Sequence, residues 1–400
     1  MADTTTGYRH LGESLGTDFF SVREQFTDEQ WERFASVRRF VDAEVLDDIG
    51  DYWEKAELPW HLFRRLPELG IVGETIQGYG AAAMSPLACG LVHMELHRGD
   101  GSLGTFLAVH AGLAMQSIAM CGSEEQKQRW LPAMSTMDEI GAFALTEPDH
   151  GSDSVALETT ARRDGDHWIL DGEKRWIGNG TIADLVIVWA RDTESGEVLG
   201  FVVETPAEGY AATVIGGKVS LRSVWQADIT LTGVRVPDEN RLAHAKTFAD
   251  CAKVLANTRG ICAWMALGHA TAGYDAALRY AMERKQFGKP LASFQIVQEK
   301  LVNMLADLTS MQLYCMQIGR LGEAGRLSPT VAGLAKMHNT KTARRLLSEA
   351  RDLLGGNGIL LEHHVVRHWA DIEAIHTFEG TETIQTLIVG KDVTGIGAFA

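Results

Sequence analysis

Apolar residues recur every three or four positions through the first third of the chain, which is the period of an amphipathic helix. The positions that mark it first are Trp31, Phe34, Val41 and Val45. The stretch Thr27-Asp28-Glu29-Gln30 reads as a capping box, in which a threonine and a glutamine satisfy each other's backbone N–H groups. Ser123-Glu124-Glu125-Gln126 repeats this signal. The pattern predicts a helical region up to about Gly141.

Between about Gly141 and Pro237 the period shortens and the chain reads as β structure. Continuous apolar runs predict buried strands at Leu185–Trp189 and Gly200–Val203. A nearly alternating apolar run, interrupted by a glycine that predicts a bulge, is Ile229, Leu231, Val234 and Val236. Asp164-Gly165 and Asp171-Gly172 are typical of hairpin turns. Together these signals favour a small antiparallel β domain, either a barrel or a sandwich.

Helical periodicity returns from about Thr247 to the C-terminus. The expected helices are Arg259 to Glu283, broken by Lys289-Pro290-Leu291, then Phe294 to Leu321, and finally Ser328 to Leu354, which Gly355-Gly356 stops. The order is α, then β, then α, without βαβ alternation. The sequence therefore predicts an α+β fold with domains at 1–140, 141–245 and 246–400.

Composition narrows the class of protein. The net charge of −16 argues against nucleic acid as a partner, because phosphate binding needs a basic surface. Five cysteines are scattered without a C-x-x-C pair, so we expect free thiols, no zinc site and a reducing, cytoplasmic environment. The polar start Met1–Ser14 lacks the apolar core of a signal peptide. We also expect no apolar run long enough to span a bilayer.

Two stretches in the β region carry residue types suited to a flat, phosphorylated ligand. In Phe143–Asp153, Leu145 and Thr146 offer backbone and hydroxyl groups, and Gly151-Ser152 offers donors to a phosphate. Trp176 stands beside a glycine-rich turn and is suited to a planar cofactor. Each stretch has a plainer explanation as well, an ordinary loop in the first case and a core tryptophan in the second.

The C-terminal region adds a basic stretch and three histidines. Arg284–Pro290, followed by Phe294-Gln295, combines a planar cation suited to a pyrophosphate with an amide suited to an adenine edge. A basic residue at a helix end also simply complements the helix dipole. His363, His364 and His368 lack the carboxylate pattern of a zinc protease, so we expect no metal site. The chain contains neither a G-x-G-x-x-G nor a P-loop motif.

The stretch Phe378-Glu379-Gly380-Thr381 offers a candidate base. A carboxylate between an aromatic residue and a glycine is suited to proton abstraction in a dry pocket, where burial raises its pKa. Gly380 and Thr381 allow close backbone approach and supply a hydroxyl. Taken alone, this stretch is better explained by a solvated glutamate at a turn.

In this order, however, the stretches resemble the acyl-CoA dehydrogenase family of flavoenzymes from about Phe26 to Phe399. The motifs that carry the resemblance are Leu-Thr-Glu-Pro…Gly-Ser-Asp, Trp-Ile…Asn, Arg…Phe-Gly…Phe-Gln, Leu-Gly-Gly-Asn-Gly and Phe-Glu-Gly-Thr. The resemblance implies an N-terminal helical domain, a middle β-barrel and a C-terminal four-helix bundle. It also implies FAD as the cofactor and a homotetramer.

The resemblance assigns roles to individual residues. Those expected to line FAD, in this subunit or a neighbouring one, are Phe143, Leu145, Thr146, Ser152, Trp176, Ile177, Gly178, Arg284, Phe287, Gln295, Asp352, Gly355, Gly356, Thr381 and Thr383. Those expected to meet the acyl-CoA are Ser152, Arg259, Gly380 and Phe399. Glu379 matches the catalytic base. Some members place the base just before the arginine matched by Arg259, but Thr258 cannot serve as one.

The implied reaction is α,β-dehydrogenation. Hydrogen bonds to the thioester oxygen stabilise the developing enolate, Glu379 removes the α-proton, and the β-hydride passes to FAD. The product is a trans-2-enoyl-CoA, and an electron-transfer flavoprotein takes the electrons. A different class of function is a non-catalytic protein that binds acyl-CoA and FAD.

Two positions depart from the subfamilies that the chain resembles most, glutaryl-CoA dehydrogenase and the plant short-chain acyl-CoA oxidase. Glutaryl enzymes carry an arginine for the distal carboxylate where this chain has Gly104, so we expect an uncharged, short- to medium-chain acyl group. Glutaryl-CoA dehydrogenase stays an alternative. Most members have a threonine where this chain has Gly178, as the plant oxidase does. We expect this glycine to open space beside the flavin, so an oxidase that forms hydrogen peroxide is a further alternative.

Overall fold

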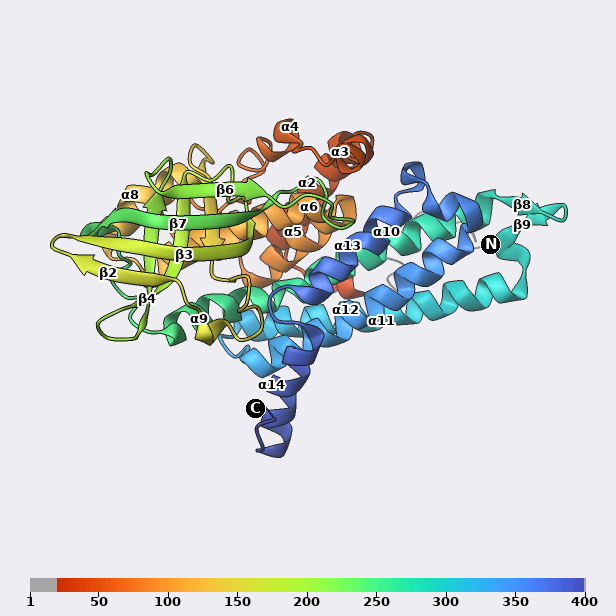
Figure 1. Cartoon of the computed structure of the whole chain (residues 1–400). Helices are drawn as coiled ribbons and strands as arrows, with labels where there is room; N and C mark the ends of the chain where they lie inside the picture. The colour runs from red at the N-terminus through yellow and green to blue at the C-terminus, as the bar shows by residue number, and fades with distance from the viewer. Residues whose placement is uncertain (1–19, 399–400) are drawn as a thin grey trace.

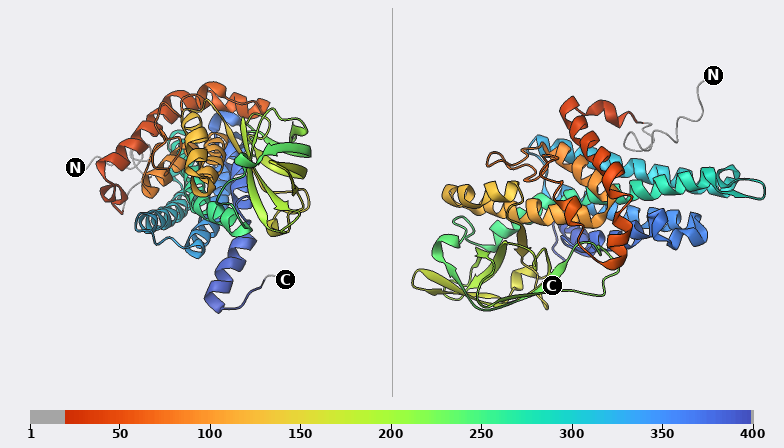
Figure 2. Two further views of the ribbon diagram at one scale, coloured as in Figure 1. Left: turned by 90° about the vertical axis from the view of Figure 1, so that its left-hand side faces the viewer. Right: turned by 90° about the horizontal axis from the view of Figure 1, so that it is seen from above.

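The computed structural model describes residues 20–398. Helices, a sheet and helices again follow one another along the chain (Figure 1). The sheet lies on one side of the molecule, and the long C-terminal helices extend away from it (Figure 2). The α-helices of the first region are α2 Asp28–Phe40, α3 Ile49–Lys55, α4 Trp60–Phe63, α5 Pro86–Gly99, α6 Gly101–Leu107, α7 Gln116–Cys121 and α8 Glu124–Ser135.

Both predicted capping boxes are confirmed. The Thr27 hydroxyl accepts from the Gln30 N–H at 3.2 Å, and the Gln30 side chain accepts from the Thr27 N–H at 3.0 Å. Ser123 and Gln126 repeat the arrangement at the start of α8. The Gln126 amide also donates to the backbone oxygens of Glu239 and Arg241, at 2.8 Å each. This cap therefore ties the first helical region to the sheet region.

The expectation that no apolar stretch is long enough to span a bilayer is wrong. The π-helical segment η3 (Ala108–Met115) joins α6 and α7 into one helix, Gly101–Cys121, with a mean hydropathy of 1.4. By length and composition this helix could cross a bilayer. However, 72% of its apolar window is buried inside the protein, as is usual for a core helix. Its apolar character is explained by that packing.

The middle region is a curled sheet of seven strands (Figure 1). The strands are β1 Gly141–Ala144, β2 Thr160–Asp164, β3 His167–Gly178, β4 Leu185–Asp192, β5 Val198–Glu204, β6 Tyr210–Val214 and β7 Gln226–Pro237. The prediction of a purely antiparallel sheet is wrong, because β4 pairs in parallel with both β1 and β2. In the chain, the β2–β3 hairpin lies between β1 and β4. The paired strands β1 and β4 are therefore not joined by a hairpin turn, and they can run parallel.

The two predicted hairpin turns have different outcomes. Asp164 pairs with His167 across a tight turn, which confirms the first. Asp171-Gly172 instead lies inside β3, where the register shifts. A Cβ atom at position 172 would lie 2.6 Å from the Thr159 hydroxyl oxygen. The glycine therefore allows β3 and the Thr159 segment to approach closely. Asp171 accepts from the Gly233 N–H at 2.7 Å, at the predicted bulge of β7.

The third region contains the long helices of a bundle. Its helices are α9 Phe248–Arg259, α10 Ile261–Glu283, α11 Gln295–Glu323, α12 Pro329–Leu353, α13 Val365–Thr377 and α14 Glu382–Thr394. The expected single helix containing Arg259 to Glu283 is interrupted at Gly260, which keeps a helical backbone conformation. After α10, the short strands β8 (Lys285–Gln286) and β9 (Lys289–Pro290) form a hairpin at one end of the bundle (Figure 1). α14 projects away from the bundle.

Two apolar cores hold the regions together. One combines helices of the first region with one face of the sheet, including Phe143 and Trp189. The other combines α5 with the bundle helices, including Trp264 of α10. Because the first region contributes to both cores, it fixes the sheet relative to the bundle. The five cysteines are buried and free, as expected.

Candidate active site

Glu379 lies in the short connection between α13 and α14. Its backbone φ is +55°, and that of the following Gly380 is +80°. Two successive residues with positive φ turn the chain sharply, and for a glutamate this conformation is strained. Thr381 then caps α14, because its hydroxyl accepts from the Ile384 N–H at 3.3 Å. Strained residues that the surrounding structure holds in place are typical of functional sites.

Glu379 is half-buried as a residue, and its carboxylate accepts a hydrogen bond from the end of α9. The Thr258 hydroxyl donates to Glu379 Oε2 at 2.8 Å. Burial raises the pKa of Glu379, while the Thr258 hydrogen bond and the cations Lys336 and Arg259 act in the opposite direction. A carboxylate with a raised pKa is a better proton acceptor than a solvated one. Thr258 cannot itself act as the base, but its hydroxyl hydrogen-bonds the carboxylate of the candidate base, Glu379.

Arg259 offers an unsatisfied donor close to Glu379. It is half-buried, and its Nε is buried without a hydrogen-bond partner among residues 20–398. Buried polar atoms without partners are uncommon in folded proteins. An anionic or carbonyl-bearing ligand would satisfy this donor, which fits the expected contact with acyl-CoA. Gly380 is adjacent to the base, whereas Phe399 lies outside the described residues.

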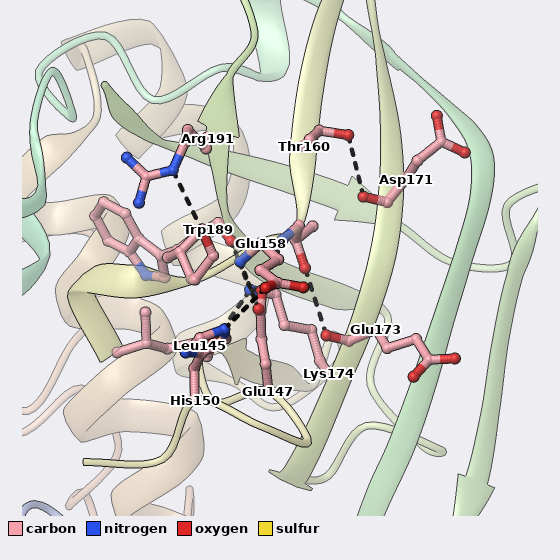
Figure 3. A network of polar contacts seen from close by, with 12 residues as sticks. Leu145, Glu147, His150, Glu158, Thr160, Asp171, Glu173, Lys174, Trp189 and Arg191 are labelled. Carbon is pink, nitrogen blue, oxygen red and sulfur yellow. Dashed lines mark hydrogen bonds and ion pairs between the residues drawn. The ribbon is translucent and has the colours of Figure 1, made fainter. Parts of the chain in front are cut away.

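The loop after β1 is pinned by a buried ion pair that sequence reasoning missed. Figure 3 shows the contact between Lys174 of β3 and Glu147 of the loop. The Lys174 Nζ donates to Glu147 Oε1 at 2.8 Å. The Lys174 ammonium also donates to the backbone oxygens of Leu145 and Trp189, at 3.0 and 2.8 Å. Burial lowers the pKa of Lys174 to about 8. Glu147 lies in the Phe143–Asp153 stretch, and Lys174 lies two residues before Trp176. The opposite charges of these two residues were the signal from which the ion pair could have been predicted.

The ion pair positions the candidate flavin residues of this loop. Glu147 also accepts from the N–H groups of Glu158 and Thr159, at 2.6 and 2.9 Å. The Thr146 oxygen accepts from the Arg175 N–H at 2.8 Å. The structure therefore brings Leu145 and Thr146 against β3. Phe143 and Leu145 are buried, Thr146 is half-buried and Ser152 is exposed.

Trp176 is presented outward by an irregularity in β3. The register with β7 shifts between Lys174 and Ile177, and the φ of Trp176 is +63°. Its indole is 52% exposed, whereas Ile177 is buried. The plainer explanation, a core tryptophan, does not hold, and an exposed, strained indole is suited to the planar ring of a flavin.

Gly178 does not open space as expected. A Cβ at this position would lie 2.8 Å from Cγ2 of Val109, in η3. A threonine would clash with that methyl group unless the helix moved. The Val109 side chain therefore fills the volume that the glycine leaves.

A second group of FAD candidates lies at the end of the bundle that is far from α14 (Figure 1). Phe287, in the β8–β9 hairpin, is 93% exposed with φ +53°. Asn357 donates to the Tyr280 hydroxyl at 3.0 Å, which holds the Gly355-Gly356 turn near the end of α10. Exposed candidates at this end are Arg284, Phe287, Gln295, Asp352, Gly355 and Gly356. The chain does not bring them to Glu379, and the resemblance assigns them to a neighbouring subunit's FAD.

Thr381 and Thr383, the last two FAD candidates, lie at the start of α14, beside Glu379. His368 and His364, two of the three neighbouring histidines of the C-terminal region, are paired with other side chains. His368 Nδ1 lies 2.8 Å from His269 Nδ1, and His364 accepts from the Arg367 guanidinium. Among residues 20–398, one group brings three potential ligands within 4.8 Å of one another, namely Glu74, Cys89 and His93. Its His93 and Glu74 atoms are 2.8 Å apart, the separation of a direct hydrogen bond.

A further residue at the site was missed by the sequence reasoning, Lys336 of α12. Its ammonium group donates hydrogen bonds to the backbone oxygens of Phe378 and Gly380, on either side of Glu379. A signal was available, because Lys336 shares the helical spacing of Ala332, Asn339 and Ala343, all of which are buried. A lysine on a buried helix face needs buried partners.

Comparisons with known proteins agree with this arrangement. Family models match in succession: acyl-CoA dehydrogenase N-terminal domain at 27–138, middle domain at 142–234 and C-terminal domain at 248–394. A 3-(aryl)acrylate reductase of Clostridium sporogenes is 31% identical, over 92% of this chain and 99% of that protein. The mitochondrial short-chain specific acyl-CoA dehydrogenase of Bos taurus is also 31% identical, over 88% of this chain and 87% of that protein.

A solved structure extends the agreement to the whole fold. A glutaryl-CoA dehydrogenase from Mycobacterium smegmatis in complex with FADH2 superposes with a TM-score of 0.93 at 38% identity, covering 95% of this chain and 98% of that one. The predicted three-part fold is confirmed. The chain therefore belongs to the acyl-CoA dehydrogenase family, FAD-dependent oxidoreductases that act on the CH–CH group of acyl-CoA.

Proposed function

We propose that this chain dehydrogenates an uncharged, short- to medium-chain acyl-CoA to the trans-2-enoyl-CoA, with Glu379 as the base. The observation that carries the proposal is Glu379 itself, a carboxylate held in a strained turn beside Thr258 and Arg259. Glu379 accepts the α-proton and becomes a carboxylic acid. FAD, when bound, supplies the acceptor for the β-hydride. The substrate thus loses a proton and a hydride, and its Cα–Cβ single bond becomes a double bond.

An uncharged acyl chain is supported by the surroundings of Gly104. A Cβ there would lie 2.1 Å from the His97 ring, so an imidazole fills the place where glutaryl enzymes carry an arginine. Burial holds the pKa of His97 well below its ordinary value, so this ring is neutral. A buried carboxylate at the end of the acyl chain would lack a cation there. Glutaryl-CoA dehydrogenase is the alternative, favoured by the 38% identity to that enzyme.

The electron acceptor is inferred from the packing around Gly178. Because Val109 fills the space beside this glycine, the site offers oxygen no added volume there. This favours an electron-transfer flavoprotein as the acceptor over direct oxidation by oxygen. The oxidase alternative rests on Gly178 and on the resemblance to the plant oxidase. A non-catalytic binding protein would not need Glu379 in a strained turn.

A homotetramer is supported by exposed apolar side chains at both ends of the bundle. Val393 and Ile396, in and just after the projecting α14, are 79% and 72% exposed, and Phe287 is 93% exposed. Side chains of this kind commonly mark a surface covered by a partner. Light scattering on the purified protein tests this, and a monomer with bound FAD would contradict it. The free thiols support a reducing compartment, the cytoplasm.

One experiment separates the candidate activities. The purified yellow protein is mixed without oxygen with butyryl-, hexanoyl-, octanoyl- or glutaryl-CoA, and air is then admitted. We expect bleaching by an uncharged substrate that persists in air. Rapid recolouring with stoichiometric peroxide would indicate the oxidase, and turnover of glutaryl-CoA at a matching rate would indicate that enzyme. Absence of bleaching with every substrate would leave a binding protein.

A further inference from the structure

Lys336 is a fully buried ammonium group in the middle of α12. Its side chain has no solvent exposure. Removing a lysine from water is unfavourable unless several acceptors surround the charge. Burial accordingly lowers the pKa of Lys336. A lysine kept in such a place needs a structural explanation.

The partners of Lys336 are the peptide groups that flank the base. Its Nζ donates to the backbone oxygens of Phe378 and Gly380, immediately before and after Glu379. The same ammonium group therefore holds both sides of the turn in which Glu379 has its positive φ. Its bonds go to peptide oxygens, whereas its influence on the Glu379 carboxylate is a longer-range attraction.

A second side chain completes the support of this turn. The Gln385 amide, one turn into α14, donates to the oxygens of Glu379 and Gly380, at 3.0 and 3.2 Å. Gln385 is fully buried as well. Three successive peptide oxygens, those of residues 378, 379 and 380, thus have buried donors. Strain at Glu379 persists because these donors hold the backbone from two helices.

We propose that Lys336 is the positioning residue of the base: its ammonium group fixes the Phe378–Gly380 backbone and so aims the Glu379 carboxylate at the substrate. The inference rests on the proposed role of Glu379. It assigns Lys336 no contact with substrate or FAD. A misplacement of the base by about 1 Å is enough to reduce turnover on the order of 100-fold.

Lys336 also contributes to the charge around the base. The groups that face Glu379 are the Thr258 hydroxyl, the cations Lys336 and Arg259, and the thiols Cys251 and Cys262. Both cations favour the ionised carboxylate. Loss of Lys336 therefore raises the pKa of Glu379, and the acid limb of the pH–kcat profile moves to higher pH.

The test compares K336M, the conservative K336R and the control K341M, in which an exposed lysine of the same helix is replaced. With the FAD-loaded protein and butyryl-CoA, we expect kcat of K336M to fall about 100-fold while KM changes little. Its acid limb should move to higher pH, K336R should recover part of kcat, and K341M should match the wild type. Bound FAD and the unfolding temperature show whether each variant folds.

Hydrogen exchange supplies a readout that does not depend on turnover. Peptides spanning residues 375–385 should exchange faster in K336M than in wild type or K341M, because the turn loses its donor. Exchange equal to wild type, or a kcat per bound flavin within about twofold of wild type, would overturn the positioning role. If wild type itself fails to bleach, the proposed function is wrong, and the exchange result still decides whether Lys336 holds the turn.

Discussion

Three neighbouring side chains, Thr258, Lys336 and Arg259, each affect Glu379 in a different way. Thr258 bonds the carboxylate directly, at 2.8 Å, whereas Lys336 bonds the backbone on either side. Arg259 faces the carboxylate and keeps a free donor for a ligand. Burial favours the protonated base, and the other groups favour the ionised base. The pKa of Glu379 is set by this balance.

The first prediction concerns the Thr258 hydroxyl. In T258V the ionised carboxylate loses its hydrogen bond, so the pKa of Glu379 rises further and the acid limb of the pH–kcat profile moves to higher pH. T258S keeps a hydroxyl and should retain the wild-type profile. The profile is measured with butyryl-CoA at saturating concentration. A limb that stays in place or moves to lower pH in T258V would contradict this account.

At the scale of elements, the loop after β1 is attached to β3 by the Lys174–Glu147 pair (Figure 3). The ammonium of Lys174 has three acceptors and no solvent exposure of its side chain. Two of these acceptors, the Leu145 oxygen and the Glu147 carboxylate, belong to the loop after β1, and the third is the Trp189 oxygen of β4. The pair therefore joins the loop to two strands at once.

The second prediction tests this attachment. K174M leaves a buried carboxylate and two peptide oxygens without their cation, so the free energy of unfolding should fall by about 3–5 kcal/mol. FAD affinity, measured by flavin fluorescence on the apoprotein, should fall as well because the Thr146 segment is released. The surface variant K341M serves as the control. Unchanged stability together with unchanged FAD affinity would rule out the attachment.

The elements that the sequence predicted well are those with local signals. Both capping boxes and the start of α12 at Ser328 depend on contacts within four residues. The parallel pairing of β4 and the position of Asp171-Gly172 inside β3 depend on distant segments, so local turn signals were misleading. The motif resemblance located Glu379, but its support by Lys336 and Gln385 depends on how α12 and α14 pack.

At the scale of the whole molecule, the three regions meet at one buried carboxylate. Asp371 of α13 accepts from the Trp53 indole N–H at 3.1 Å and from the Leu221 N–H at 2.6 Å. Trp53 belongs to the first region and Leu221 to the segment before β7. Burial, with repulsion from Asp100 next, raises the pKa of Asp371 from 3.8 to about 7.

The third prediction follows from this raised pKa. Between pH 3.8 and about 7 the folded state keeps a proton on Asp371 that the unfolded chain has released. The contribution of Asp371 to the free energy of unfolding therefore falls as the pH rises through this window. In D371N this dependence is absent, because the amide stays neutral and its oxygen still accepts both bonds.

Denaturant unfolding at several pH values measures the effect. The stability of D371N relative to wild type should increase from pH 4 to pH 7. The exposed variant D392N on α14 should show no such trend. A difference between D371N and wild type that is constant with pH, or that decreases, would contradict the assignment.

The central claim, that Glu379 removes the α-proton, is tested most directly by anaerobic stopped-flow bleaching of wild type and E379Q with butyryl-CoA. Loss of a general base typically costs 10²–10⁴-fold, so we expect E379Q to bleach at least about 100-fold more slowly. Its bound FAD and affinity for acyl-CoA should match the wild type, since the amide has the same shape. Bleaching of E379Q at the wild-type rate would show that another group removes the proton.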